Sequence, residues 1–295
     1  MSAKTIAILM PGDMGHAVGR ALKEHGYDVV TALEGRGEHT HALAREARLR
    51  DVETLRNVVE AADLILSILP PAAAVQQAEK VAAEMNASGR KPIYVDCNAI
   101  SPETAKKVAG VIEGANAPFI DAGIIGLAPG KGAGPRFYVS GPDVSAMLEL
   151  DGKGFRVIRS GENVGEASAL KMTYAGLTKG TWTLQTAVLL TAQRLGVIDT
   201  LLEEFEFSQG AALNAMRNTI PFLPADSARW IGEMEEIAAT FASADVSSGF
   251  HDGAADVFRV LAETPFAEET RATLDRSRTL EEAVAVYEKY LDTTR

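Results

Sequence analysis

The sequence predicts an α/β protein in which a mostly parallel sheet is followed by an all-helical domain. Three observations lead to this prediction. Short apolar runs alternate with helical stretches as far as about residue 160, a glycine-containing turn follows the first of these runs, and no convincing strand occurs after about residue 165. Strands that alternate with helices form right-handed βαβ units around a parallel sheet.

The predicted strands are brief apolar runs, such as TIAILM at residues 5–10. Runs of this kind are typical of parallel strands that are buried on both faces. Residues typical of turns or of helices stand on both sides of each run. We expect strands at residues 5–10, 27–33, 63–69, 92–96, 119–123, 137–140 and 155–159.

The helices of the first half have recognisable ends. Gly26 follows the first helical pattern and is predicted to end that helix, because glycine is common just beyond the last residue of a helix. Ser101 and Pro102 suit the cap and the first turn of another helix, and a further helix is expected over residues 72–85.

The second half is predicted to be helical throughout. Residues 166–195 contain no proline and only two glycines, and their apolar residues lie on more than one face, which indicates a buried central helix. We therefore expect two domains, residues 1–162 and 163–295, the second also forming a homodimer through excess apolar surface. Further helices are expected at residues 201–207, 210–219, 227–241, 253–263 and 280–291.

Composition excludes several classes of protein. The chain has 295 residues, 29 Lys and Arg against 40 Asp and Glu, and a formal net charge of −11. This acidity disfavours nucleic acid and anionic membrane surfaces as partners. No apolar run approaches the roughly 20 residues that span a bilayer, and the segment after Met1 lacks the layout of a signal peptide. We expect a cytoplasmic protein.

Cysteine and histidine usage argues against a metal site. Cys97 is the single cysteine, so an intramolecular disulfide and a cysteine-based metal cluster are both excluded. Among the five histidines, only His39 and His41 are close in sequence, and they lie in a predicted loop. We predict no bound metal, and we interpret Cys97 as a small buried residue rather than a nucleophile.

A dinucleotide-binding turn is indicated at residues 10–15. A strand, a glycine turn and a helix allow backbone N–H groups to approach a pyrophosphate at the positive end of the helix. The pattern G-x-G-x-x-G occurs here with Met10 in place of its first glycine, and a tight turn of another α/β fold remains an alternative. The predicted cofactor-binding residues of the turn are Pro11, Gly12, Asp13, Met14 and Gly15.

The end of the second predicted strand bears on the choice between NAD and NADP. A carboxylate there favours the ribose hydroxyls of NAD, whereas an arginine favours the 2′-phosphate of NADP. Glu34 and Arg36 are both present, and Arg36 is followed by further basic residues. The sequence favours NADP, with NAD as the alternative, and a solvated loop charge is the other interpretation of Arg36.

Five segments in order resemble the β-hydroxyacid dehydrogenases, relatives of 6-phosphogluconate dehydrogenase and of the imine reductases. The resemblance implies an N-terminal Rossmann-type dinucleotide-binding domain and a C-terminal helical domain for substrate and dimerisation. The C-terminal segment is more similar to a poorly characterised subgroup with its own helical domain. The matching segments are MPGDMG at 10–15, SILPP at 67–71, VDCNAISP at 95–102, FIDAGIIG at 119–126, GEASALK at 165–171 and, for the subgroup, RWIGEMEEI at 229–237.

The resemblance also implies roles for particular residues. Leu69, Pro70 and Asn98 lie where the family's chain passes beside the cofactor. Gly123, Ile124 and Ile125 match the segment that binds the substrate, and Lys171 matches the catalytic lysine. Without the resemblance, a lysine near a helix start whose ammonium reaches solvent is the alternative for Lys171.

Departures from the family pattern change the expected substrate. The family has a Ser-Gly pair in this segment that holds the substrate carboxylate, whereas the match here is Ile124, Ile125 and Gly126, so a bulky apolar or aromatic substrate is expected. Ala175 replaces the family's asparagine. Tyr174 lies one turn beyond Lys171, as a second candidate catalytic residue or as a packed core residue.

Two other charged positions are interpreted as structural. Lys179 is expected at the surface or in an interface. Glu233 flanks the apolar stripe of its helix and is expected to be solvated.

The predicted function is hydride transfer between a nicotinamide cofactor and a small-molecule substrate with a C–OH or C=O group. A buried lysine can exchange a proton with an alcohol or carbonyl, which is the role expected of Lys171. Two alternatives stay open: reduction of a C=N bond, and a dinucleotide-binding sensor without turnover.

Overall fold

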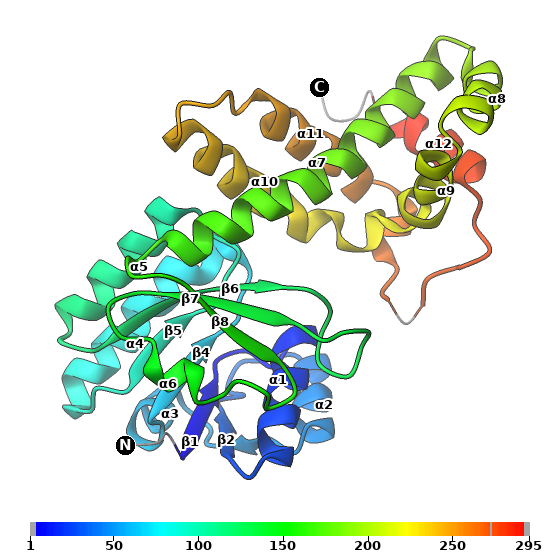
Figure 1. The fold of residues 1–295 in the computed structure, drawn as a ribbon. Coiled ribbons are helices and arrows are strands. Elements are labelled where there is room, and N and C mark those ends of the chain that lie inside the picture. Colours follow the sequence, from blue (N-terminus) through cyan, green and yellow to red (C-terminus); the bar gives the residue numbers. More distant parts are fainter. Residues whose placement is uncertain (1–3, 272, 292–295) are drawn as a thin grey trace. The chain divides into compact units, whose positions relative to one another are not determined.

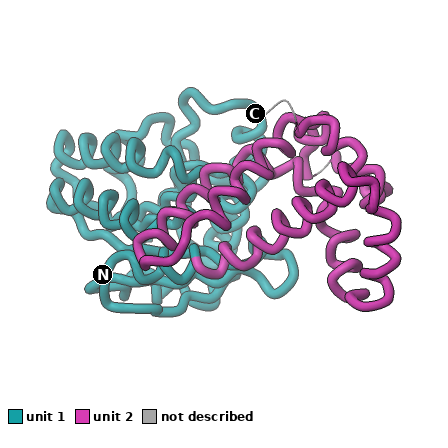
Figure 2. Tube along the Cα trace, turned by 90° about the horizontal axis from the view of Figure 1, so that it is seen from above, with its two compact units in different colours: residues 1–172 teal, residues 173–295 magenta. Residues whose placement is uncertain are grey.

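The computed structural model describes residues 4–271 and 273–291 and confirms the predicted fold class. The chain divides into two compact units, Met1–Met172 and Thr173–Arg295, shown in teal and magenta in Figure 2. The predicted functional division into residues 1–162 and 163–295 stays a prediction. Residues 1–3, which begin the segment expected to lack the layout of a signal peptide, lie outside the described residues.

The first unit contains an eight-stranded sheet in the order β3-β2-β1-β4-β5-β6-β7-β8 (Figure 1). Neighbouring strands are parallel except β6 and β7, which are antiparallel. All seven predicted strands are present, and the two-residue β3 is an addition that its polar sequence did not indicate. The strands are β1 Thr5–Ile8, β2 Asp28–Thr31, β3 Arg50–Asp51, β4 Leu64–Ser67, β5 Ile93–Asp96, β6 Phe119–Ile125, β7 Arg136–Ser140 and β8 Arg156–Gly161.

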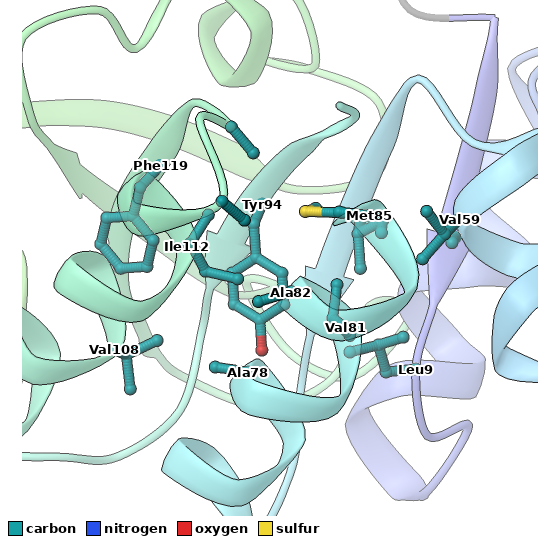
Figure 3. Packing of buried hydrophobic residues seen from close by; sticks show 14 of the residues in the cluster. Leu9, Val59, Ala78, Val81, Ala82, Met85, Tyr94, Val108, Ile112 and Phe119 are labelled. Atoms are coloured by element: carbon teal, nitrogen blue, oxygen red, sulfur yellow. The ribbon is translucent and has the colours of Figure 1, made fainter. Parts of the chain in front are cut away.

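Apolar side chains on both faces of the sheet form two core layers, as expected for parallel strands. One layer packs α3, α4 and α5 against the sheet, and the other packs α1 and α6 against the opposite face. Figure 3 shows the first layer, with the ring of Tyr94 among Ala82, Met85 and Ile112. The helices of this unit are α1 Asp13–Glu24, α2 Glu38–Glu46, α3 Leu55–Ala61, α4 Ala74–Ser88, α5 Pro102–Gly114 and α6 Ser145–Leu148, with the short 3-10 turn η1 Pro71–Ala73.

The helix-end signals noted in the sequence are confirmed. Gly26 has φ of +87° and its N–H donates to the carbonyl oxygen of Lys23, which closes α1. The hydroxyl of Ser101 accepts a hydrogen bond from the backbone N–H of Thr104, and Pro102 begins α5.

The second unit is helical, and no strand occurs among its described residues. None of the helices in the described ranges combines the length and apolar character needed to cross a membrane. The helices are α7 Glu166–Arg194 (which begins in the first unit), α8 Ile198–Ser208, α9 Gly210–Thr219, α10 Pro224–Ser243, α11 Gly249–Ala262 and α12 Leu280–Tyr287, with 3-10 turns at Ile220–Phe222, Pro265–Glu268 and Glu288–Tyr290.

Helix α7 differs from the buried central helix that the sequence predicted. In the single chain, Leu177 is 75% exposed and Leu184 is 62% exposed. The exposed residues recur at alternating spacings of four and three, so they form one stripe along the helix. The expected buried central helix is only partly covered within the single chain, because apolar content does not show which side of a helix another element of the same chain covers. The stripe consists of Leu170, Tyr174, Leu177, Thr181, Leu184, Val188, Thr191 and Leu195.

Candidate active site

The predicted cofactor-binding residues gather at one edge of the sheet. Because β2, β1, β4, β5 and β6 are parallel, the loops after their last residues lie at the same edge. Successive strands are added in opposite directions from β1, toward β2 on one side and β4 on the other. Ligands of open α/β sheets bind at this kind of position, outside the carboxyl ends of the strands.

The glycine turn between β1 and α1 has the geometry that a dinucleotide requires. A Cβ on Gly15 would lie 2.5 Å from the carbonyl oxygen of Met10, so only glycine permits this approach of helix to strand. A Cβ on Gly12 would meet nothing within 4 Å, which leaves open space at the helix N-terminus. The first-glycine position needs no glycine here, because Met10 is not among the described residues with positive φ. These residues fit a bound pyrophosphate.

The other residues of the turn are placed in different environments. Pro11 is buried, Met14 is half-buried, and Asp13 is exposed as the first residue of α1. The exposure of Asp13 leaves its carboxylate accessible to water.

Arg36 lies next to the glycine turn. Its Nη1 is 3.8 Å from the Sδ atom of Met10, and the side chain is half-buried. Glu34 is exposed, and its backbone N–H donates to the carbonyl oxygen of Glu53. The structure therefore brings the basic candidate for ribose recognition to the turn, in contact with the residue that replaces the first glycine.

Asn98 braces the ends of β4 and β5. Its Nδ2 donates to Oγ of Ser67 (3.2 Å) and to Oδ2 of Asp96 (2.9 Å), and its Oδ1 accepts from the backbone N–H of Leu69 (2.6 Å). The residue is only 2% exposed. Asn98 thus fixes the segment that contains Leu69 and the exposed Pro70.

The predicted substrate segment belongs to β6, which extends two residues beyond its expected end at Gly123. Successive side chains of a strand alternate between faces, so Gly123 and Ile125 share one face and Ile124 lies on the other. Ile124 packs in the core layer that contains Phe137 and Val18. The strand alternation buries Ile124 in the single chain, and its predicted role in a substrate pocket stays a prediction. Ile125 is half-buried.

Lys171 lies directly beside Gly123. A Cβ on Gly123 would be 2.7 Å from the Cβ of Lys171 and 2.8 Å from the carbonyl oxygen of Ala167. A glycine is required for such a close approach of α7 to β6. The structure thereby joins the predicted catalytic lysine to the predicted substrate segment, at the sheet edge that carries the glycine turn.

The other predicted catalytic residue is less enclosed. Tyr174 follows Lys171 by one turn of α7 and is 53% exposed in the single chain. The alternative of a tyrosine packed in the core of this chain is not what the structure shows.

Lys179 was expected at the surface or in an interface and Glu233 in solvent, but the structure buries both side chains within the second unit. Nζ of Lys179 lies 2.8 Å from Oε1 of Glu233, and both side chains are buried. Nζ of Lys179 also lies 5.5 Å from the centroid of the Trp230 ring. The sequence pattern of a helix shows which face a residue occupies. It does not show whether another helix of the same unit covers that face, and here one does.

Three polar residues near Lys171 were missed by the sequence analysis. Oδ2 of Asp121 accepts hydrogen bonds from the backbone N–H groups of Gly165 (2.9 Å) and Ser168 (3.1 Å) and from the hydroxyl of Ser140 (3.0 Å). Its Oδ1 accepts from the hydroxyl of Ser168 at 2.6 Å. Burial raises the pKa of Asp121 above its ordinary value, and the hydrogen bonds oppose this rise. The sequence contained one indication of this buried polar cluster, which is an aspartate inside an otherwise apolar strand.

Cys97 is buried, as predicted, and burial raises the pKa of its thiol. In the described ranges, no three His, Cys, Asp or Glu residues come together in a way that suits a metal ion.

Comparisons with known proteins agree with this arrangement. Residues 5–149 match the NAD binding domain of 6-phosphogluconate dehydrogenase, and residues 192–261 match a domain of unknown function, DUF1932. An uncharacterised 28.5 kDa protein of Methanothermus fervidus is 31% identical over 183 residues, which cover 62% of this chain and 69% of that protein.

Solved structures show the same fold. A conserved protein of unknown function, structurally similar to 3-hydroxyacid dehydrogenases, has a TM-score of 0.65 at 27% identity, over 87% of this chain and 96% of its own. The 3-hydroxyisobutyrate dehydrogenase of Mycobacterium tuberculosis has a TM-score of 0.65 at 19% identity, over 95% and 99%. An imine reductase of Myxococcus stipitatus with NADP⁺ has a TM-score of 0.55 at 18% identity, over 94% and 99%.

The two domain matches occur in order along one chain. The N-terminal match supports a nicotinamide dinucleotide as cofactor and an oxidoreductase as the class of protein. The relative from Methanothermus fervidus extends the similarity to most of a second protein. The chain belongs to the 6-phosphogluconate dehydrogenase-like family, in the group that joins this NAD binding domain to a DUF1932 domain.

Proposed function

We propose that this protein is an NAD(P)-dependent dehydrogenase or reductase acting on a C–OH/C=O couple. The observation that carries the proposal is the close approach of Lys171 to Gly123 on β6, at the sheet edge where the glycine turn lies. An amine at this position can exchange a proton with a substrate oxygen. Imine reductases commonly lack this lysine, so its presence favours a carbonyl or alcohol over an imine.

The chain's own residues have separate tasks in this reaction. Bound nicotinamide supplies the hydride acceptor or donor. In the oxidative direction, Lys171 takes the hydroxyl proton as the hydride leaves the carbinol carbon, and the products are a carbonyl compound, a reduced cofactor and a protonated lysine. The glycine turn and the brace formed by Asn98 orient the cofactor, since positioning is the protein's contribution to such chemistry.

Ile125 supports a substrate with an apolar part. Its side chain lies on the same face of β6 as Gly123, and it occupies a position where the related dehydrogenases carry a polar carboxylate-binding pair. One fully covered aliphatic side chain favours an apolar group by about 1.5–3 kcal/mol. The substrate we propose is therefore a bulky alcohol or ketone rather than a small hydroxy acid.

NADP is the cofactor that the position of Arg36 favours. Its guanidinium lies at the glycine turn, and guanidinium groups bind phosphate through charge-assisted hydrogen bonds. The exposed Glu34 is the feature that would favour NAD.

The proposal is tested by cofactor consumption with purified protein and a panel of bulky ketones, small hydroxy acids and imines, each with NADPH or NADP⁺. We expect turnover of bulky ketones or alcohols, and its loss in Lys171→Met, which keeps the length of the side chain without the amine. Turnover of imines alone would identify a C=N reductase. Tight NADPH binding without turnover of any compound would identify a sensor.

A homodimer is proposed for this protein, formed through α7. From Thr173 to Gln193 the only charged residue is Lys179, which is buried against Glu233, so the exposed stripe of α7 carries no charge. An apolar, uncharged surface can meet its own copy across a twofold axis without electrostatic cost. Beside it, a groove of about 570 Å³ between α7 and α11 includes Phe250, which is 81% exposed.

The dimer is tested by sedimentation velocity. Wild type is expected to sediment as a dimer, and the double variant Leu177→Glu with Leu184→Glu as a monomer. Leu127→Glu is the matched control, because Leu127 is 54% exposed but lies on a loop of the first unit. A monomeric wild type would contradict the proposal.

A further inference from the structure

Helix α7 begins without a side-chain cap of its own. The residue before its first turn is Gly165, with φ of +100° and no side chain. The first N–H groups of a helix have no partner inside the helix and must be satisfied from elsewhere. At α7 the N–H of Glu166 donates to the carbonyl oxygen of Asn163 in the preceding loop, and other N–H groups donate to the sheet.

Two paired residues of neighbouring strands receive these N–H groups. Asp121 of β6 and Ser140 of β7 are partners in the antiparallel register. Oδ2 of Asp121 accepts from the N–H groups of Gly165 and Ser168, and the hydroxyl of Ser140 accepts from Ala167 at 2.9 Å while donating to Asp121. All of these atoms are buried, and Asp121 is 0% exposed.

The same strand fixes the helix at a second point. Asp121 and Gly123 are two residues apart on β6, so they lie on one face. Asp121 holds Ser168, and Gly123 admits the Cβ of Lys171, which is one turn further along α7. A helix held by its first turn and packed one turn later cannot slide or rotate relative to the strand without breaking one of the two contacts.

We propose that Asp121 is a positioning residue, which caps α7 from the sheet and thereby places Lys171 against Gly123 of β6. This inference rests on the proposed role of Lys171, but the capping and the placement can be measured without a substrate. An anion at a helix N-terminus is favoured by the helix dipole, which explains the choice of a carboxylate at a buried position.

The test uses the full-length variants Asp121→Asn and Ser168→Ala. Asparagine keeps one oxygen for the backbone N–H groups but loses the charge, and Ser168→Ala removes only the 2.6 Å hydrogen bond. Thr54→Ala is the matched control, because Thr54 caps α3 by accepting from the N–H of Asn57, away from α7.

Hydrogen exchange, followed by mass spectrometry of peptides covering residues 165–171, measures the capping. We expect exchange at least tenfold faster in Asp121→Asn and a smaller increase in Ser168→Ala. Thr54→Ala should accelerate exchange only near its own helix.

The labelling rate of Lys171 with an acetylating reagent, followed from pH 6 to 11, measures the placement of the amine. In Asp121→Asn the labelling rate at each pH should rise toward that of an exposed lysine. With a turned-over substrate, kcat should fall at least tenfold, while the Kd for NADPH stays within twofold.

Unchanged exchange and unchanged labelling in folded Asp121→Asn and Ser168→Ala would overturn the inference. If Asp121→Asn does not fold, Ser168→Ala decides it by the same two measurements. The proposed function fails if Lys171→Met turns over substrate normally. In that case the exchange and labelling data still decide whether Asp121 is a positioning residue.

Discussion

Each unit contains a buried carboxylate that is bound to α7, and the two are held in different ways. Asp121 in the first unit is held by uncharged donors, namely two hydroxyls and two backbone N–H groups. Glu233 in the second unit is held at 2.8 Å by the ammonium of Lys179. The difference shows that a buried charge can be balanced either by dipoles at a helix end or by an opposite charge.

The two arrangements also differ in what lies beside them. The hydrogen bonds of Asp121 fix the turn of α7 that precedes Lys171, at the predicted site. The Lys179–Glu233 pair lies in the second unit near Trp182 and Trp230, whose ring centroids are 5.4 Å apart. We therefore expect substitutions near the first carboxylate to affect chemistry and substitutions of the ion pair to affect stability.

The largest expected effect is on catalysis. Lys171→Ala should lower kcat by about 10²–10⁴, the usual contribution of a positioned acid–base group. The substitution keeps the Cβ that packs on Gly123, so the unfolding transition should change little. Steady-state kinetics and thermal unfolding of the same preparation check both expectations.

Two related variants define the role of the amine. Lys171→Arg should restore little activity, because a guanidinium keeps its proton at working pH. Tyr174→Phe should cost less than Lys171→Ala. Normal turnover by folded Lys171→Ala would show that another group carries the proton.

The ion pair predicts a large effect on stability. Glu233→Ala should lower the free energy of unfolding by about 3–5 kcal/mol, because it leaves the ammonium of Lys179 buried without this carboxylate. The double variant Lys179→Met with Glu233→Leu should lie within about 1 kcal/mol of wild type, since no unpaired charge remains. Urea unfolding measures both, and a small loss in Glu233→Ala would mean that the pair behaves as a surface one.

A smaller effect is expected on cofactor binding. Arg36→Ala should weaken NADPH by about 1–3 kcal/mol, the loss of a charged hydrogen-bond partner. NADH should bind almost as before. Titration calorimetry with both cofactors checks this, and equal losses for the two would count against recognition of the 2′-phosphate.

Two buried tyrosines, one in each unit, predict effects of opposite sign. The hydroxyl of Tyr94 has no hydrogen-bond partner in the described part of the chain, so Tyr94→Phe should raise stability by about 1 kcal/mol. The hydroxyl of Tyr287 donates to the carbonyl oxygen of Ile220 at 2.9 Å, so Tyr287→Phe should cost about 1 kcal/mol. In urea unfolding, the free energy of unfolding should therefore be higher than that of wild type for Tyr94→Phe and lower for Tyr287→Phe.

The smallest effects concern pH. Because burial raises the pKa of Asp121, the folded protein binds this proton more tightly than the unfolded chain does, and the residue contributes more stability as pH falls through its raised pKa. For Asp226, burial is outweighed by Arg229 and Arg271, which lower the pKa, so its contribution is lost as pH falls from the ordinary value through the lowered one.

Asparagine variants of these two aspartates distinguish the two opposite dependences of stability on pH. From pH 7 to pH 4, the stability of wild type relative to Asp121→Asn should increase. Relative to Asp226→Asn, it should decrease as pH falls further, below 4. Urea unfolding at each pH provides the measurement, and parallel trends for the two variants would contradict the assigned directions.

Much of the fold was predictable from the sequence by itself. The apolar runs, the glycine turn, Gly26 and Ser101 are local signals, and the chemistry that they report acts within a few residues. The positions of Lys171 and Gly123 as candidates depended on a resemblance of ordered segments. The match of residues 5–149 to an NAD binding domain agrees with that resemblance.

Tertiary structure alone decided how these residues meet. The alternation of β6 packs Ile124 in the core layer, and α10 covers Lys179 with the carboxylate of Glu233. The hydrogen bonds of Asp121 to Ser168 join residues 47 positions apart. Such contacts are set by the packing of distant segments, and a periodic pattern along the chain carries information only about which side of its own helix or strand a residue occupies.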